Sequence, residues 1–385
     1  MELYVHIPFC RKKCRYCSFT SHVGTETEYE EYTALLLKEA EDRKNEVSEP
    51  IRTVYLGGGT PSLLPAGIFS KLLAGLRDIF DFSQVTEFTS EANPGTVTGE
   101  WLHSAVDSGI NRLSLGMQAK QDHILSLLGR IHRFEDVVLS VEMARKSGIG
   151  NISLDLIFGI PGQTVAEWRD TLDAALSLHP DHISAYGLIP EEGTPLYCDL
   201  EKRLLELPDP DDERLMYDEA ISIFSDNGLY QYEISNFARK GFECRHNIGY
   251  WTQIPYIGLG VSAASMTDIA AGPNGISYTR RTNPDSGEHY RRMIINHFPP
   301  PSVQQITPAE ARFEAMMLGL RMNDGIGEET FSRMHGMPVN QCFGNLEDLL
   351  HKGLLLHKDG RWKMTRRGFD IQNSILVELM ENQLS

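Results

Sequence analysis

The sequence has no apolar run that approaches the roughly 20 residues needed to cross a lipid bilayer. Its first ten residues contain neither a basic region nor a long apolar stretch, so we expect no signal peptide. Basic residues are scarce as well, because 36 Lys and Arg face 53 Asp and Glu, for a net charge of −17. A surface of this sign repels phosphate backbones and anionic lipid, so we expect neither nucleic-acid binding nor direct membrane insertion.

Cysteine is rare and unevenly distributed: three of the six crowd near the start, and the other three are scattered, as Cys10, Cys14, Cys17 and then Cys198, Cys244, Cys342. A disulfide framework would instead spread distant pairs through a small secreted chain. We therefore expect a metal or redox centre at the crowded three, in a cytoplasmic protein, and packing roles for the scattered ones.

The chain alternates short β-branched runs with longer amphipathic stretches over its first two-thirds. The predicted strands are Leu3–Ile7, Thr53–Leu56, Glu87–Glu91, Arg112–Leu115, Ile152–Ile157 and His182–Tyr186, and the predicted helices between them include Tyr29–Lys44, Ile68–Ile79, Phe134–Lys146 and Ala166–Leu178. Such alternation indicates βαβ units and a parallel sheet. Because there are about six units and not the eight of a closed barrel, we predict an α/β fold, a partial (β/α)6 TIM-type barrel.

Three regions follow from these patterns. Residues 1–270 form the barrel with an extension, in which Leu229–Asn236 is a further predicted strand and Phe237–Asn247 a predicted loop. Residues 271–305, with their Gly and Pro clusters, are a predicted connecting segment. Residues 306–385 are a predicted small α+β domain of winged-helix type, with helices followed by a hairpin. Acidic residues outnumber basic ones there, which favours a structural cover over DNA binding.

The crowded cysteines form a CxxxCxxC motif directly after the first predicted strand. Three thiolates on one tight loop can hold three irons of a cubane cluster and leave the fourth iron open to a small ligand. The basic neighbours, Arg11 to Lys13 and Arg15, favour thiolates and an anionic cluster. The alternative is a structural zinc site, for which His6 or His22 would have to supply the fourth ligand.

This motif, placed at the end of the first strand of a βα array, resembles that of the radical S-adenosylmethionine (SAM) superfamily. The resemblance implies a [4Fe-4S] cluster on Cys10, Cys14 and Cys17, with SAM chelating the open iron and an electron from the cluster breaking a carbon–sulfur bond of SAM to give a 5′-deoxyadenosyl radical. The run Gly57–Pro61 after the second strand would then meet the methionyl amino group; taken alone it is a tight turn.

The whole chain resembles, more narrowly, the oxygen-independent coproporphyrinogen III oxidases and the related heme chaperones of the HemW type. The segments that carry this resemblance include Tyr4–Cys10, Ser90–Pro94, Leu115–Gln118, Leu127–Arg130, Leu154–Gly159, Pro190–Leu196, Tyr232–Ala238 and His246–Trp251. It implies contacts to the cluster-bound SAM at Tyr4, Tyr16, Gly58 and Glu91, contacts to a second SAM at Gly59, Thr60, Gln118, Arg130 and Asp155, and further backbone contacts to SAM at Gly187 and Ala264.

Physical chemistry supports these positions unequally. Glu91 and Asp155 stand in otherwise apolar predicted strands, where an unpaired charge is costly, so a functional role is favoured for both. Gln118 and Arg130 fit a surface or ion-pair role equally well.

Two departures separate the chain from the oxidases. Phe19 stands where the oxidases carry an additional cysteine, and we expect no N-terminal extension of the kind that encloses their porphyrin. The chain also matches the HNxxYW signature of the heme chaperones, as His246-Asn247-Ile248-Gly249-Tyr250-Trp251. A neutral imidazole is a good axial ligand for heme iron, and Tyr250 and Trp251 offer flat apolar surface, although a lone His is by default a surface or satisfied core residue.

We therefore expect a heme chaperone on a radical SAM scaffold. It would deliver heme to respiratory heme-accepting proteins and would need an electron donor for its cluster. The alternative function is oxidative decarboxylation of coproporphyrinogen III propionates in porphyrin biosynthesis. Whether SAM is cleaved or instead regulates transfer or formation of a homodimer is left open by the sequence.

Overall fold

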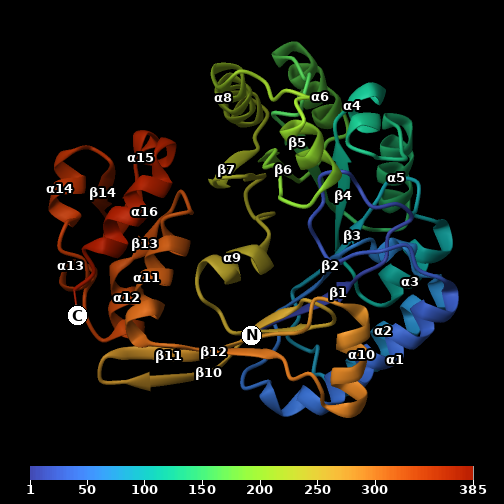
Figure 1. Ribbon diagram of the computed structural model, residues 1–385, viewed down its shortest axis with the longest axis horizontal. Coiled ribbons are helices and arrows are strands. Elements are labelled where there is room, and N and C mark those ends of the chain that lie inside the picture. The colour runs from blue at the N-terminus through green and yellow to red at the C-terminus, as the bar shows by residue number, and fades with distance from the viewer. Residues whose placement is uncertain (385) are drawn as a thin grey trace.

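A computed structural model describes residues 1–384. Six parallel strands lie in chain order in one sheet and confirm the predicted partial barrel (Figure 1); they are β1 (Glu2–Ile7), β2 (Thr53–Gly58), β3 (Glu87–Ala92), β4 (Arg112–Gln118), β5 (Asn151–Phe158) and β6 (His182–Gly187). Helices cover their outer face; they are α1 (Glu26–Arg43), α2 (Ala66–Ile79), α3 (Gly99–Asp107), α5 (Phe134–Lys146) and α6 (Val165–Ser177). The short helix α4 (Asp122–Leu127) packs in a separate small apolar cluster with Leu128, Ile157 and Leu196.

The strands alternate between an apolar outer face and a polar inner face. In β1, Leu3, Val5 and Ile7 are fully buried in the core beneath the helices, whereas Glu2, Tyr4 and His6 occupy the intervening positions. Successive residues of a strand point to opposite sides of the sheet, so the inner wall of the barrel is polar. The main hydrophobic core therefore lies between the strands and the outer helices, and the lumen is available for a polar site.

The outer helices begin where the sequence provides caps. Thr25 accepts a hydrogen bond from the backbone N–H of Glu28, and the Glu28 carboxylate accepts one from the N–H of Thr25, which is a complete capping box for α1. Thr164 and Glu167 do the same for α6. Each box satisfies N–H groups that the first turn of a helix leaves free.

The sheet continues on both sides of the six parallel strands, with the additional strands β7 (Tyr230–Glu233), β8 (Asn236–Ala238), β9 (Tyr256–Leu259), β10 (Ala264–Gly272), β11 (Gly275–Thr282) and β12 (Ser302–Ile306). Residues 271–305, predicted as a connection, thus contain most of a hairpin, helix α10 (Gly287–Asn296) and most of β12. Helix α10 packs Tyr290, Met293 and Ile294 into the barrel core, because its apolar face lies against α1.

The prediction of one strand over Leu229–Asn236 and a loop over Phe237–Asn247 is wrong. The chain turns back at Ile234-Ser235, where the Glu233 carboxylate accepts hydrogen bonds from the Ser235 N–H and the Asn236 amide, and so forms the hairpin β7–β8. Helix α9 (Arg245–Trp251) then occupies the end of the predicted loop and continues beyond it. The residue pattern did not predict either element, because the turn depends on the burial of a carboxylate and the helix is only two turns long.

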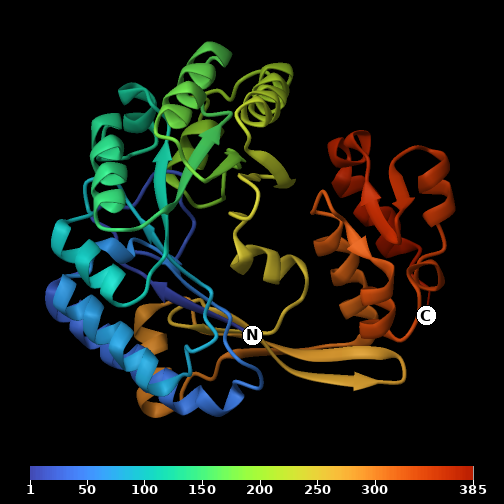
Figure 2. The ribbon, with the colours of Figure 1, turned by 180° about the vertical axis from the view of Figure 1, so that it is seen from behind.

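The C-terminal region is a small α+β unit that contains a hairpin, as predicted; a third strand, β13, extends this hairpin to a three-stranded antiparallel sheet. Its elements are α11 (Pro308–Gly319), β13 (Ile326–Gly327), α12 (Glu328–His335), α13 (Val339–Cys342), α14 (Leu346–His351), β14 (Leu355–Lys358), β15 (Arg361–Met364), α15 (Arg366–Asp370) and α16 (Gln372–Glu381). The long β10–β11 hairpin extends from the barrel toward this unit, which stands beside α9 and the β7–β8 end of the sheet (Figures 1 and 2).

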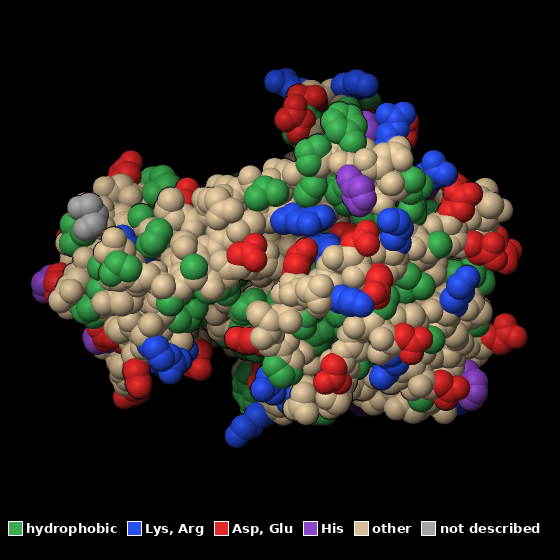
Figure 3. All heavy atoms as spheres, turned by 90° about the horizontal axis from the view of Figure 1, so that it is seen from below, with side chains coloured by type: hydrophobic (Ala, Val, Ile, Leu, Met, Phe, Trp, Pro, Cys, Tyr) green, Lys and Arg blue, Asp and Glu red, His purple; other side chains and the backbone are tan. Residues whose placement is uncertain are grey.

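Within residues 1–384, no helix is both long and apolar enough to span a bilayer. The face seen from below in Figure 3 carries acidic and basic side chains in a mixed pattern, without a continuous band of Lys and Arg across that face.

Candidate functional site

The cysteine loop is fixed at the carboxyl end of β1 by backbone hydrogen bonds. The N–H of Cys10 donates to the carbonyl of His22 (2.9 Å), and the N–H of Arg15 donates to the carbonyl of Leu128 (2.9 Å). The carbonyl of Arg15 in turn accepts from Leu196, at the start of α7 (Pro195–Glu201). The loop is therefore held on several sides at the edge of the barrel where ligands bind in α/β folds.

The thiols in this loop are half-buried and two of them receive hydrogen bonds. The hydroxyl of Thr60 lies 3.6 Å from Sγ of Cys10, and Nη1 of Arg130 lies 3.4 Å from Sγ of Cys14. Burial raises the pKa of Cys17. Three thiols with cationic and hydroxyl donors around them suit an anionic iron–sulfur cluster, since hydrogen bonds to sulfur stabilise negative charge there.

Both histidines considered as the fourth ligand of a zinc site have other partners. His6 uses both ring nitrogens, with the Tyr4 hydroxyl 3.0 Å from Nδ1 and the carbonyl of Thr20 2.9 Å from Nε2. His22 pairs with Glu28. Among residues 1–384, no three His, Cys, Asp or Glu side chains form a group that could hold a single metal ion.

The glycine run after β2 lies close to the base of the cysteine loop. Gly58 has a φ of +104°, and a Cβ there would lie 2.4 Å from the His6 ring. A Cβ on Gly59 would lie 2.7 Å from the carbonyl oxygens of Ile7 and Phe9, to which the N–H groups of Gly59 and Thr60 donate. The backbone N–H groups of this run are thus already paired, and the carbonyls of Thr60 and Pro61 accept from Leu63 and Leu64, so a ligand's amino group would meet the carbonyls of the glycines.

A cavity of about 380 Å³ opens beside the cysteine loop. Four of the residues predicted to contact SAM line it, namely Tyr4, Gly58, Glu91 and Ala264. Residues 18–20, which directly follow the last cysteine, form another part of its wall. The structure therefore brings together, around one cavity, residues from β1, β2, β3 and β10 that are far apart in the sequence.

Two acidic side chains project from the inner wall. Glu91 accepts hydrogen bonds from the Tyr55 hydroxyl (2.8 Å) and the Gly58 N–H (3.0 Å). Burial, together with the negative charge of Asp155, raises the pKa of Glu91 to about 7. Asp155 accepts from the hydroxyls of Ser114 and Ser184, and burial raises its pKa as well. Glu91 is therefore poised to change its protonation state when a charged ligand arrives.

The residues predicted to hold a second SAM do not line this cavity. Thr60 and Arg130 contact the cysteines, and Asp155 is bound by serines, as described above. Gln118 has a φ of 64°, and its amide approaches Arg130 across Gly116, where an added Cβ would lie 2.8 Å from Nε2 of Gln118 and 2.9 Å from Nη2 of Arg130.

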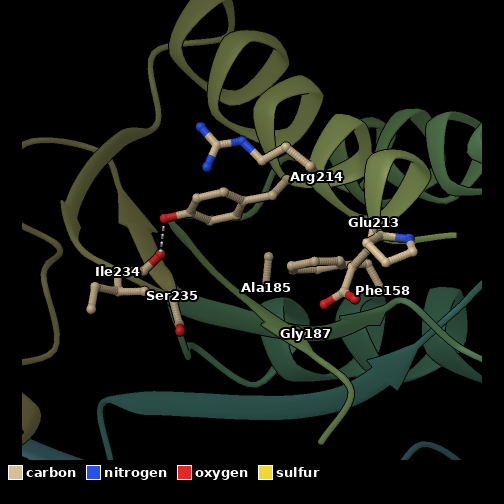
Figure 4. A pocket seen from close by; sticks show the side chains of 9 residues that line it. Phe158, Ala185, Gly187, Glu213, Arg214, Ile234 and Ser235 are labelled. Atoms are coloured by element: carbon tan, nitrogen blue, oxygen red, sulfur yellow. Dashed lines mark hydrogen bonds between the residues drawn. The ribbon is translucent and has the colours of Figure 1, made fainter. Parts of the chain in front are cut away.

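Tyr16 and Gly187 also lie away from this cavity. Tyr16 packs against a small apolar cluster that includes Leu125, Leu128 and Leu196. Gly187 borders a separate cavity of about 350 Å³ between the sheet and α8 (Pro210–Asp226), which Figure 4 shows with Phe158 and Glu213 beside it. Its neighbour Ala185 belongs to the core beneath the outer helices, so this cavity lies on the opposite side of the sheet from Asp155.

His246 lies at the other end of the barrel from the cysteines. Its side chain is 1% exposed, with the Thr53 hydroxyl 2.7 Å from Nδ1 and the Tyr250 hydroxyl 2.9 Å from Nε2. The N–H groups of Arg245 and His246 donate to Glu87, so α9 closes the amino-terminal ends of β2 and β3. Burial lowers the pKa of His246 to about 3, and the ring is neutral.

The other side of α9 faces a second cavity of about 380 Å³ between the barrel and the C-terminal unit. Its wall is mostly apolar and aromatic, with Tyr4, Tyr250, Trp251, Tyr256, Met266, Tyr278, Met317 and Leu318 among its members. Tyr4 and Ala264 border both this cavity and the one beside the cysteine loop, so the two adjoin. Asn247 is half-buried on the same helix.

Two further residues of the site were not predicted in their observed roles: Asn93 was given no role, and His6 only that of a possible zinc ligand. Asn93 bonds to both Thr60 (2.7 Å) and Arg130 (2.6 Å), and His6 supports Tyr4 and covers Gly58. Their positions in the sequence could have indicated these roles, because Asn93 directly follows a strand and His6 alternates with Tyr4 on the inner face of β1.

The chain is similar to known proteins over both the barrel and the C-terminal unit. The radical SAM superfamily matches residues 4–175 and the HemN C-terminal domain matches residues 306–371. The chain is 36% identical to the heme chaperone HemW of Bacillus subtilis, over 97% of each chain, and 31% identical to that of Escherichia coli, over 98% of this chain and 97% of the other.

Among solved structures, coproporphyrinogen III oxidase (HemN) from Escherichia coli superposes with a TM-score of 0.80 at 21% identity, covering 99% of this chain and 89% of that one, which establishes the shared fold. The radical SAM superfamily implies a [4Fe-4S] cluster and SAM. With more than 30% identity to curated relatives over nearly its whole length, the chain belongs to the radical SAM superfamily and, within it, to the family of the heme chaperones HemW.

Proposed function

We propose that this protein is a cytoplasmic heme chaperone, which binds heme and passes it to heme-accepting proteins, including respiratory ones. The observation that carries the proposal is the full-length relationship to proteins named heme chaperone HemW, which spans both the barrel and the C-terminal unit. The side chain of Phe19, where the oxidases carry a cysteine, is 64% exposed and offers no metal ligand next to the three thiols.

In this proposal Cys10, Cys14 and Cys17 hold the cluster, and SAM occupies the cavity lined by Tyr4 and Glu91. The bound cluster would supply one electron at a time, received from a separate donor protein. Glu91 would offer a carboxylate to the polar groups of SAM, Tyr4 would form part of the cavity wall, and the carbonyls of the glycine run would accept from the amino group of SAM. Iron and sulfide are measured in the anaerobically reconstituted protein, with Cys244→Ser as a buried-cysteine control. Absence of both from the wild type would overturn this part of the proposal.

Heme would occupy the aromatic cavity between α9 and the C-terminal unit. Flat aromatic walls suit a macrocycle, and the residues of the HNxxYW segment that border this cavity are Tyr250 and Trp251. The family resemblance assigns the iron ligand to His246, and in that case the ring must give up the hydroxyl of Tyr250 or of Thr53. The thioethers of Met266 and Met317 are the alternative ligands within the cavity.

An anaerobic heme titration followed by absorption tests the proposal on the reconstituted full-length chain. We expect saturable binding in the wild type and at least a 10-fold weaker affinity in Trp251→Ala, since an aromatic wall is lost. Leu207→Ala, which truncates an exposed side chain remote from the cavity, is the matched control. Absence of saturable binding by the wild type would overturn the chaperone function and make anaerobic coproporphyrinogen turnover the next measurement.

The titration also identifies the iron ligand. Loss of the ligation band in His246→Ala, with an intact fold, would show that the ring turns away from Thr53 or Tyr250 to bind iron. Retention of the band in His246→Ala and its loss in Met266→Leu or Met317→Leu would place the ligand inside the aromatic cavity.

A further inference from the structure

Asn93 joins two hydrogen-bond donors that act on different cysteines. Its amide Nδ2 donates to the Thr60 hydroxyl (2.7 Å), and its Oδ1 accepts from Nη2 of Arg130 (2.6 Å). Thr60 then donates to Sγ of Cys10 (3.6 Å), and Arg130 donates to Sγ of Cys14 (3.4 Å). The result is a continuous chain of hydrogen bonds from one thiol of the loop to another, with Asn93 at its centre.

Further contacts hold this series of hydrogen bonds in place. Arg130 also donates to the carbonyl of Gly116 (2.7 Å), and a Cβ at position 116 would lie 2.9 Å from Nη2 of Arg130 and 3.1 Å from Oδ1 of Asn93. Glycine at this position therefore leaves the room in which the two side chains meet. The backbone of Asn93 is held as well, because its carbonyl accepts from the Thr96 hydroxyl (2.7 Å).

The direction of each bond is fixed by chemistry. The guanidinium of Arg130 can only donate, and it uses the amide oxygen of Asn93 as acceptor, which turns the Asn93 NH2 group toward Thr60. Because the Thr60 oxygen accepts from that NH2 group, its single proton is left to point at Cys10. Asn93 thus aims both donors at sulfur, although it touches neither cysteine itself.

We propose that Asn93 is a positioning residue that orients Thr60 and Arg130 onto the thiolates of Cys10 and Cys14, and thereby raises the reduction potential of the cluster and slows its loss. This inference rests on the cluster proposed above. Hydrogen bonds to ligand sulfurs favour the reduced, more negative cluster, and partners outside the ligand set orient the ligands themselves. Thr60 and Arg130, expected from family resemblance to hold a second SAM, also make these contacts with the cysteines.

The test is a redox titration of the reconstituted full-length protein without SAM, followed by electron paramagnetic resonance of the reduced cluster. We expect a more negative potential in Asn93→Ala than in the wild type, and iron loss to a chelator that is roughly 10-fold faster. Asn93→Asp should shift the potential further, because a carboxylate accepts the Thr60 proton and so withdraws it from Cys10. Asn111→Ala is the matched control, since that amide makes two hydrogen bonds at the opposite end of the β3–β4 pair and contacts no cysteine.

A thermodynamic cycle, in which Asn93→Ala is compared with and without the pair Thr60→Val and Arg130→Met, separates positioning from a merely structural role. If Asn93 acts through Thr60 and Arg130, the shift from Asn93→Ala disappears when Thr60→Val and Arg130→Met are already present. A potential and an iron-loss rate equal to those of the wild type, or a shift that persists in that background, would overturn the inference while leaving the cluster itself established. A wild type that takes up no cluster would overturn the proposed site as a whole. If Asn93→Ala does not fold by circular dichroism, Thr60→Val alone must lower the potential.

Discussion

The hydroxyl of Tyr250 lies 2.9 Å from Nε2 of His246, so the His and the Tyr of the HNxxYW segment are hydrogen-bonded to each other. The two sides of helix α9, which carries them, lie in different surroundings. His246 closes the amino-terminal end of the barrel, whereas the rings of Tyr250 and Trp251 border the aromatic cavity. In (β/α) barrels the amino-terminal end serves stability, which explains why the imidazole is buried and fully bonded.

Replacing His246 should therefore destabilise the apo protein, whatever its effect on heme binding. We expect His246→Ala to lower the free energy of unfolding of the apo protein by roughly 2–4 kcal/mol, because it leaves a cavity and two hydroxyls without a partner. Tyr250→Phe removes only one hydrogen bond and should cost about 1 kcal/mol. Urea unfolding monitored by circular dichroism measures both. An apo stability unchanged by His246→Ala would contradict the structural role of the ring.

Glu91 should make the stability of the apo protein depend on pH. Its pKa in the folded state is raised to about 7 from an ordinary value of 4.5, so the native state holds the proton more tightly than the unfolded chain. The contribution of Glu91 to the free energy of unfolding is therefore complete below pH 4.5, declines as pH rises and is lost above about pH 7. Its total is on the order of 3 kcal/mol. Glu91→Gln should flatten the unfolding free energy between these pH values.

The same substitution should weaken the response of the cluster to SAM. Without the carboxylate, the change that SAM causes in the paramagnetic resonance spectrum of the reduced cluster should require at least a 10-fold higher SAM concentration. A variant with the wild-type SAM response and a flat pH profile would show that Glu91 serves the fold alone.

Two glycine substitutions should have effects of opposite sign. Gly58→Ala places a Cβ 2.4 Å from the His6 ring at a φ of +104°, so we expect a loss of roughly 2 kcal/mol or more in unfolding free energy. Gly67→Ala lies in helix α2, where a Cβ would meet no atom within 4 Å, and should stabilise by about 0.5 kcal/mol. Thermal unfolding of the two variants distinguishes them, and equal melting temperatures would contradict the strained geometry at Gly58.

Arg321 should contribute strongly to the attachment of the C-terminal unit. Its Nε lies 2.6 Å from the carboxylate of Glu233, whose side chain is fully buried, and its guanidinium lies over the Trp251 ring at 4.6 Å. Arg321→Met leaves that carboxylate without its cation and should cost roughly 2–4 kcal/mol.

The control for this prediction is Arg366→Met. Arg366 pairs with Asp218 between the same two parts of the molecule, but both side chains are more than 40% exposed, so the loss should stay below about 1 kcal/mol. Denaturant midpoints of the two variants give the comparison, and similar costs would contradict the assignment of the stronger contact to Arg321.

Local periodicity was enough to predict the barrel. The apolar residues of strands such as β1 and β5 and the spacing of helices such as Phe134–Lys146 are properties of short segments, and the structure reproduces the bounds of that helix. The CxxxCxxC loop was equally readable, because its ligands are close in the chain. The hairpin at Ile234-Ser235 and helix α9 were missed, since the carboxylate of Glu233 pairs with the distant Arg321 and the first turn of α9 with the distant Glu87.

By itself, the sequence determined the fold class, the cysteine loop and the family, because each rests on residue order within short segments. Only the tertiary structure decided which side chains meet. It directed His246 to Thr53, placed Asn93 between Thr60 and Arg130, and formed two adjoining cavities at Tyr4 and Ala264. The physical reason is that strand register and sheet closure, which set these contacts, join residues tens to hundreds of positions apart, where no local pattern records the partner.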